Sequence, residues 1–127
     1  MKDYRKASRS VYDLNYHLVW VTKYRKPVLF GDVADSAREL IREICKSLDI
    51  KIIRGRVSED HVYLFVSVPQ QLSISKVIGL IKAKTSRKLP KGFWGRPLWA
   101  RGYFAASFDN VTDEAIMQYI VLHKPGR

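Results

Sequence analysis

The chain has 127 residues, 46% of them hydrophobic, which suffices for one domain with a core and is too short for two. Its apolar runs fall far below the roughly 18 residues of a membrane-spanning helix, and the N-terminal MKDYRKASRS lacks the apolar segment of a signal peptide, which predicts a cytoplasmic protein. The single cysteine, Cys45, falls on the apolar stripe of a predicted helix, so it argues for packing and against disulfides, cysteine-based zinc sites and a cysteine nucleophile.

The charge balance is the strongest bulk signal. The net charge is +11, from 23 Lys and Arg residues against 12 Asp and Glu residues. Such an excess attracts polyanions and favours phosphate contacts, so nucleic acid is the leading class of partner. The alternatives are an ordinary basic protein or one that touches anionic lipid. We see no basic amphipathic helix of the membrane-surface type, which favours nucleic acid.

The first half of the chain predicts strand, helix, strand and strand. Residues 12–23 are rich in aromatic and branched side chains and alternate like a strand with both faces covered or used. Asp32 can cap a helix over residues 33–48, whose apolar positions form one stripe. Residues 50–57 form a second predicted strand, which a short polar turn joins to a third strand over residues 60–69.

The second half predicts helix, loop, strand and helix. A helix runs from about Ser73 to the residue before a proline, and the glycine- and proline-rich residues 90–99 are typical of a loop. Residues 100–108 form a fourth predicted strand. Thr112 can cap a last helix that runs to about residue 123.

The order β-α-β-β-α-β plus one helix predicts an α+β fold, a ferredoxin-like antiparallel sheet with two helices on one face and the other face open. The whole chain, 1–127, is then one domain with a core of about 12–123. In this topology the first and third strands are central neighbours. His17 on the first strand can therefore share the open face with His61 and Tyr63 on the third, if the register allows.

The third strand, DHVYLFVSVP, raises the question of chemistry. Its valines and leucine alternate onto one face, while His61, Tyr63 and Phe65 occupy the other. Three interpretations fit this second face: a base-stacking platform, a metal site in which a His and a donor two residues on lie side by side, or an aromatic cluster beneath the last helix.

The last helix places Tyr119 four residues before His123, hence on the same helical face. A tyrosine hydroxyl beside a metal ligand is a plausible covalent nucleophile, because a divalent cation can polarise a scissile phosphate while the phenolate attacks it. Tyrosine needs such help, since its ordinary pKa is about 10. The alternative is that both side chains only pack this helix on the sheet.

Five segments, taken together, resemble a known family. They are YHLVWVTKYRKPVL (16–29), DHVYLFVSVP (60–69), IKAKTSRKL (81–89), LWARGYF (98–104) and DEAIMQYIVLH (113–123). In this order they resemble the single-tyrosine HUH transposases, the transposase A family of the smallest bacterial and archaeal insertion sequences. The resemblance covers residues from about 12 to 123.

The resemblance implies a specific activity. Such proteins cut single-stranded DNA at element ends folded into hairpins, form a 5′-phosphotyrosine link, release a 3′-hydroxyl and later rejoin the strands. By position, Tyr119 is the implied nucleophile, His61 the first histidine of the HUH pair, and His123 the ligand from the tyrosine helix. The implied metal is Mg²⁺ or Mn²⁺, and the implied assembly is a homodimer that binds hairpin-containing single-stranded DNA, with no membrane partner.

Tyr63 departs from the family pattern, because it occupies the place of the second HUH histidine. A neutral phenol is a weaker ligand than imidazole, although a phenolate oxygen suits Mg²⁺. Three outcomes are open: weakened or metal-selective cutting, which we rank first; substitution by His17 or Asp60; or an inactive, domesticated protein that only binds hairpin or single-stranded nucleic acid.

Several basic and aromatic residues are candidates for DNA contacts, although each alone is nonspecific. Trp94, Trp99 and Tyr103 are candidates for stacking on bases. The predicted phosphate contacts are Lys23, Arg25, Lys26, Lys82, Lys84, Arg87, Lys88, Arg96 and Arg101.

Overall fold

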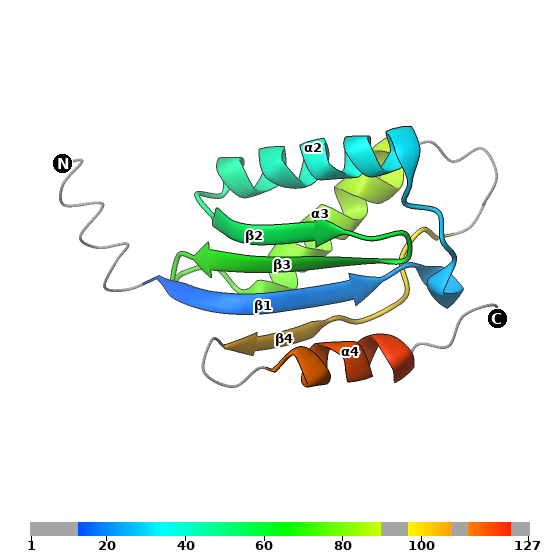
Figure 1. The fold of residues 1–127 in the computed structure, drawn as a ribbon. Coiled ribbons are helices and arrows are strands. Elements are labelled where there is room, and N and C mark those ends of the chain that lie inside the picture. The colour runs from blue at the N-terminus through cyan, green and yellow to red at the C-terminus, as the bar shows by residue number, and fades with distance from the viewer. Residues whose placement is uncertain (1–12, 90–96, 108–111, 123–127) are drawn as a thin grey trace.

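A computed structural model describes residues 13–89, 97–107 and 112–122 (Figure 1). Its elements confirm the predicted order. They are β1 (Leu14–Val21), the 3₁₀ turn η1 (Lys23–Arg25), α2 (Gly31–Ser47), β2 (Lys51–Val57), β3 (His61–Val68), α3 (Ile74–Lys88), β4 (Phe104–Ser107) and α4 (Asp113–Leu122). Within the described ranges, no helix is long and apolar enough to cross a membrane.

The four strands form one antiparallel sheet in the order β2-β3-β1-β4, which confirms the predicted ferredoxin-like α+β fold. Helices α2 and α3 cover one face, and α4 lies on the opposite face beside β4 (Figure 1). The expectation that this second face is open is therefore wrong over β1 and β4. The last helix packs there because it carries its own apolar residues, Ile116 and Ile120.

The main core lies between the sheet and the helices α2 and α3. Alternate residues of β1 and β3, among them Leu18, Trp20 and Leu64, meet Ile41 of α2 and Ile81 of α3. Each of these side chains is at most 3% exposed. Fully burying one such aliphatic side chain contributes about 1.5–3 kcal/mol, so this face dominates the stability of the fold.

A second, smaller cluster fixes α4 to the other face. Val19 and Val21 of β1 and Ile120 of α4 are its buried members, and the partly buried residues around them are Tyr63, Ala100, Phe104, Ile116 and Tyr119. Residues 17–21 of β1 are thus buried on both faces, as the aromatic and branched composition of the strand predicts.

The helix ends show which local signals determine the structure. The side chain of Ser73 accepts the N–H of Lys76 at 3.2 Å, and that of Thr112 accepts the N–H of Ala115 at 3.1 Å, as caps do. The predicted cap at Asp32 is wrong, because α2 begins one residue earlier, at Gly31. Gly31 has a φ of +58°, which a glycine adopts without strain, and it turns the chain into the helix.

The fourth strand is shorter than predicted. The continuous strand is Phe104–Ser107 rather than 100–108, and before it Trp99 only forms an isolated bridge with Thr22 while the N–H of Ala100 donates to the carbonyl of Val21 at 3.0 Å. The ammonium of Lys82 donates to the carbonyls of Ala100 and Gly102 at 2.9 and 2.6 Å, and Gly102 has a φ of +83°, so the chain leaves β1 after residue 100 and pairs with it again from Phe104. Residues 90–96 of the predicted loop and residue 108 of the predicted strand lie outside the described ranges.

Two glycines offer a test of the helix assignments. A Cβ on Gly79, exposed in α3, would meet nothing within 4 Å. Gly79→Ala should therefore raise the free energy of unfolding by about 0.5–1 kcal/mol in a urea titration. Gly31→Ala is the control, because its positive φ should make the same change destabilising by about 1 kcal/mol. Equal effects of the two changes would contradict these backbone assignments.

Candidate active site and nucleic-acid interface

The register between β1 and β3 assembles the candidate site. Val21 pairs with His61, Val19 with Tyr63 and His17 with Phe65. Because paired residues of an antiparallel ladder point to the same side, all six side chains face α4. The predicted sharing of one face by His17, His61 and Tyr63 is confirmed.

His17 and Tyr63 form a side-chain pair at the centre of this face. The Nδ1 atom of His17 lies 2.9 Å from the Tyr63 hydroxyl oxygen. Burial, and to a smaller extent the positive charge of Arg54, lowers the pKa of His17, while the negative charge of Asp113 partly offsets this shift. The lowered pKa favours a neutral imidazole. In the tautomer that carries its proton on Nε2, Nδ1 accepts the hydrogen bond and Tyr63 is the donor.

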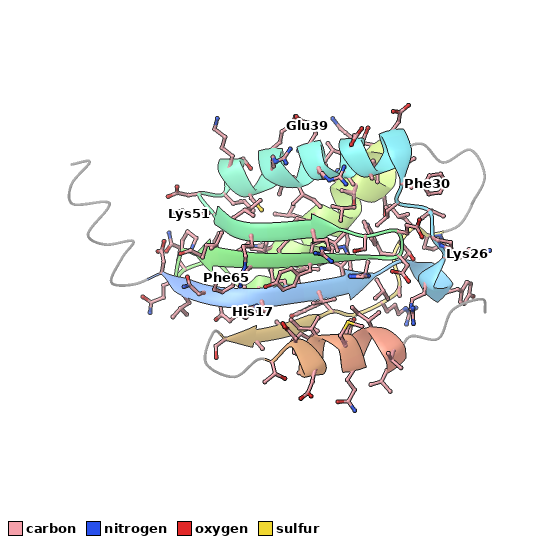
Figure 2. All side chains as sticks on the ribbon, viewed as in Figure 1. His17, Lys26, Phe30, Glu39, Lys51 and Phe65 are labelled. Carbon is pink, nitrogen blue, oxygen red and sulfur yellow. The ribbon has the colours of Figure 1, made fainter. Side chains whose placement is uncertain are left out.

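Phe65 does not provide an open stacking platform. Its ring stacks on that of His17 with centroids 4.3 Å apart, and the guanidinium carbon of Arg54 lies 5.2 Å from its centroid. The two rings are shown on their neighbouring strands in Figure 2. Phe65 is only 6% exposed. The base-stacking interpretation is therefore not supported at Phe65, and His17, Phe65 and Arg54 form a closed stack.

His61 has the environment of a metal-binding imidazole. Its Nδ1 lies 2.8 Å from Oδ1 of Asp60, and a carboxylate partner on one ring nitrogen is what supports an imidazole that binds a metal through the other. Desolvation opposes ionisation of Asp60, but the hydrogen bonds from His61 and Arg25 outweigh it and lower the pKa of Asp60. Asp60 is thus a carboxylate at neutral pH and fits this supporting role.

Arg25 connects this carboxylate to the helix that carries Tyr119. Its Nε donates to Oδ2 of Asp60 at 3.1 Å, and its Nη1 donates to the backbone carbonyl of Ile120 at 3.2 Å. We call this connection the Arg25 bridge. Tyr24 and Arg25 both have positive φ, 57° and 51°, a conformation that costs a residue with a side chain about 1–2 kcal/mol. The bridge offsets part of this cost and aims the guanidinium inward.

Tyr119 faces the same side of the sheet. Its ring centroid is 5.7 Å from that of Phe104, and it belongs to the second cluster together with Tyr63. Burial raises the pKa of Tyr119, so the phenol stays protonated at neutral pH unless a positive charge approaches it. The structure thus brings the predicted nucleophile to the face that carries His61 and Tyr63.

The predicted metal ligands are only partly placed. His123 lies outside the described residues, and the described ones hold no group of three His, Cys, Asp or Glu side chains suited to a metal ion. His61 fits a metal ligand, because its carboxylate partner is in place. The Tyr63 oxygen is already hydrogen-bonded to His17, so it fits less well.

The predicted DNA contacts fall into two groups. Arg25 and Lys82 use their charged groups within the chain, and burial lowers the pKa of Lys82. Trp99 is 6% exposed and donates its indole N–H to Thr85, so its predicted stacking on bases is wrong. Arg96 and Trp94 lie outside the described ranges, Lys23 is partly exposed, and the exposed candidates are Lys26, Lys84, Arg87, Lys88, Arg101 and Tyr103.

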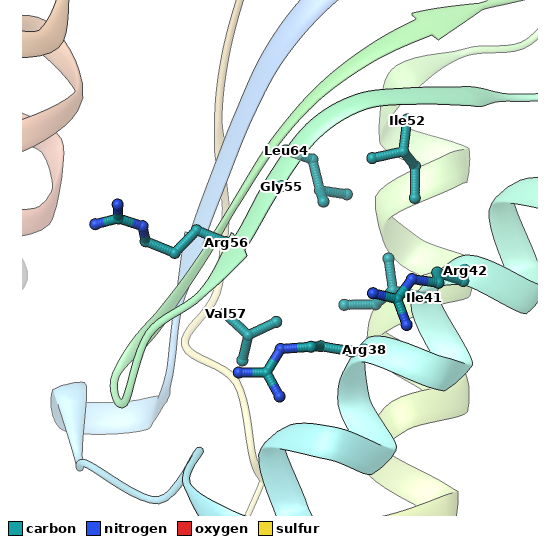
Figure 3. A pocket seen from close by; sticks show the side chains of 8 residues that line it. All are labelled: Arg38, Ile41, Arg42, Ile52, Gly55, Arg56, Val57 and Leu64. Carbon is teal, nitrogen blue, oxygen red and sulfur yellow. The ribbon is translucent and has the colours of Figure 1, made fainter.

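The structure also contains a groove between α2 and β2 that the sequence did not predict. It encloses about 120 Å³ and is lined by Arg38, Ile41, Arg42, Ile52, Gly55, Arg56, Val57 and Leu64 (Figure 3). Its signal in the sequence is the spacing of Arg38, Arg42 and Lys46, each four residues from the next and therefore on one stripe of a helix.

The Arg25 bridge yields a prediction about α4. Arg25→Ala should increase hydrogen–deuterium exchange of the α4 amides, because the helix loses its polar connection to Asp60. Lys26→Ala is the matched control, since Lys26 is the exposed next residue and carries the same charge. Unchanged exchange of α4 in Arg25→Ala would show that apolar packing alone holds the helix.

Comparison with known proteins identifies the family. The model of the family "Transposase IS200 like" matches residues 10–123. The ISDra2 transposase TnpA of Deinococcus radiodurans is 32% identical over 123 residues, which cover 91% of this chain and 88% of that protein. The transposase for insertion sequence element IS200 of Salmonella typhimurium is 25% identical over 127 residues, 94% of this chain and 83% of that protein. The chain belongs to the IS200-like transposase family.

Solved structures agree with this assignment. A crystal structure of a protein from D. radiodurans R1, assigned as a transposase, superposes with a TM-score of 0.82 at 29% identity and covers 91% of this chain and 94% of that one. A REP-associated tyrosine transposase bound to a REP hairpin has a TM-score of 0.64 at 14% identity, covering 82% of this chain and 61% of that one. The second likeness shows the shared fold alone.

Proposed function

We propose that this transposase cuts and rejoins single-stranded DNA at hairpin-containing element ends through a 5′-phosphotyrosine intermediate on Tyr119. The observation that carries the proposal is the docking of α4, which brings Tyr119 to the sheet face that holds His61 and Tyr63. A hairpin as the DNA ligand is in keeping with the hairpin bound by the REP-associated relative.

The proposed step exchanges one phosphoester bond for another. The Tyr119 oxygen loses its proton to solvent and attacks the scissile phosphorus, the bond from phosphorus to the 3′-oxygen breaks, and that oxygen takes up a proton as it leaves as a 3′-hydroxyl. Attack of a 3′-hydroxyl on the phosphotyrosine reverses these events and rejoins a strand. Because the number of phosphoester bonds is conserved, no external energy source is required.

A divalent cation, Mg²⁺ or Mn²⁺, is proposed at His61, with Tyr63 and His123 as the other candidate ligands. When bound, such an ion polarises the scissile phosphate and favours the phenolate. This chain contributes an imidazole held by Asp60 and a phenol held by His17. The hydrogen bond to His17 supports weakened or metal-selective binding as the consequence of a tyrosine at position 63.

The assembly is proposed to be a homodimer. The outer side of α4 exposes Met117, Val121 and Leu122, which are 57, 60 and 73% exposed. Apolar side chains this exposed on a docked helix are typical of a surface that another chain covers. A second function, binding of hairpin or single-stranded nucleic acid without cutting, is favoured by one observation: the His17–Tyr63 hydrogen bond occupies the phenol where the family has its second histidine.

A covalent adduct tests the proposed reaction. Wild-type protein and labelled single-stranded hairpins from DNA flanking the gene, incubated with Mn²⁺, should give a protein–DNA band that survives denaturation. Tyr119→Phe should abolish the band because it removes the attacking oxygen. Tyr16→Phe is the matched control, since Tyr16 packs against the main core on the opposite face of the sheet. DNA binding without any adduct would instead support the non-cutting function.

Tyr63 can be tested as a ligand without measuring cleavage. Tyr63→His should raise Mn²⁺ affinity in a calorimetric titration by about tenfold or more, because imidazole replaces a neutral phenol. Tyr63→Phe, which keeps the ring and removes the oxygen, should lower the affinity below that of the wild type. If neither variant changes Mn²⁺ binding, position 63 contributes no ligand.

A further inference from the structure

The seam between α2 and β2 carries a run of cations that the proposed chemistry does not use. Beside the groove near Gly55 lies a second, more open hollow of about 490 Å³, and both hollows are lined by Arg42 and Ile52. Lys46, Asp49 and Lys51 line this second hollow. The two hollows are neighbours between α2 and β2, and we call them together the α2–β2 groove.

The sequence creates the groove at two places. On β2, Gly55 faces Leu64, and a Cβ at position 55 would lie 3.1 Å from the Leu64 side chain, so the absence of a side chain leaves the hollow open. On α2, the apolar stripe turns toward the core and places Arg38, Arg42 and Lys46 along its edge. In Figure 3 the guanidinium groups of Arg38 and Arg42 extend from α2 toward β2, whereas Arg56 extends away from α2.

The geometry of the cations suits a linear polyanion. Successive members of the stripe are about 6 Å apart along the helix axis, and the stripe from Arg38 to Lys46 spans about 12 Å. Asp35, Glu39 and Glu43 stand three residues before Arg38, Arg42 and Lys46 on α2, and Asp49 lines the second hollow. Asp35 pairs with Arg38 at 2.7 Å, whereas Glu39 and Glu43 are exposed and line neither hollow. Both Arg38 and its partner are well exposed, so this ion pair is weak and an incoming phosphate can compete for Arg38.

The opposite side of the same strand extends the positive surface. Arg54 and Arg56 pair with Phe65 and Tyr63, which places them on the face of the sheet away from α2. Strand β2 is an edge strand, so cations line both sides of a free sheet edge. The groove itself has an apolar floor of Ile41, Ile52 and Leu64, against which a sugar or base can rest.

We propose that the α2–β2 groove binds the sugar–phosphate backbone of the DNA substrate at a distance from the strand that is cut. This inference rests on the proposed function for the identity of the polyanion. The groove lies at the β2 edge and on the helix-covered face, whereas Tyr119 docks over β1 and β4 on the other face. The groove therefore contributes affinity and orientation but no group to the reacting phosphate.

Salt-dependent binding provides the test. In a Tyr119→Phe background with EDTA, so that nothing is cut, the affinity for a labelled single-stranded hairpin is measured across a series of salt concentrations. Replacing Arg38, Arg42 and Lys46 by Gln should flatten the plot of log affinity against log salt by about 0.7–0.9 for each phosphate that the variant no longer neutralises. Arg42→Gln alone should account for about one phosphate.

The matched control is Lys76→Gln, which removes one exposed positive charge from α3, away from the groove. Because Lys76 lines neither hollow, this change should alter the salt slope by much less than Arg42→Gln does. Thermal melting of each variant establishes that it is folded. Equal slopes for Arg42→Gln and Lys76→Gln would overturn the proposal. A triple variant that self-associates yet keeps the wild-type affinity for DNA would also overturn it, because the cations would then only prevent pairing between the β2 edges of two chains.

The two proposals fail separately. If hairpin DNA binds with the predicted change of slope but no covalent adduct forms with Mn²⁺, the groove is supported as a DNA-binding surface and the proposed cutting reaction is contradicted. If an adduct forms while the slopes of all variants match that of the wild type, the reaction stands and the groove is excluded as a DNA contact.

Discussion

The antiparallel register of β1 against β3 is the constraint on which the site depends. It pairs Val21 with His61 and Val19 with Tyr63, so that the small second cluster and the polar side chains share one face. A slip of one residue would turn every side chain of β1 to the other face, burying His17 in the main core and exposing Leu18 and Trp20. The large apolar face toward α2 and α3 makes such a slip prohibitive. The apolar packing of the main core therefore determines which side chains lie on the opposite face, although the core itself supplies no polar group to the site.

The polar network on the other face couples the two parts of the proposed active site. His61 contacts Asp60, Asp60 accepts from Arg25, and Arg25 donates to the carbonyl of Ile120, next to Tyr119 in the chain. Since α4 buries few apolar groups, a hydrogen bond to its backbone is a substantial part of what holds it. The same few contacts orient the imidazole of His61 and position the helix that carries Tyr119, so a disturbance at one end of the network is expected to reach the other.

The sequence predicts the element order, the strand faces and the family, because these follow from periodicity and from local motifs such as the cap at Thr112. The sequence does not predict features that depend on contacts between residues far apart in the chain. The start of β4 depends on Lys82, about 20 residues earlier, donating to two carbonyls of the incoming chain. The burial of Trp99 depends on Thr85, and the inward role of Arg25 depends on Asp60. No spacing along the chain encodes these partners, and the same holds for a groove opened by Gly55 across from α2.

The assignment of the nucleophile is the central claim, and the chain contains seven tyrosines that could compete for the role. Proteolysis of the denatured protein–DNA adduct, followed by mass spectrometry of the nucleotide-bearing peptide, identifies the attacking residue directly. We predict a single modified peptide, with the phosphonucleotide on Tyr119 of α4. A nucleotide on Tyr63, or one spread over several tyrosines, would contradict a reaction organised by the docking of α4 on the face of β1 and β3.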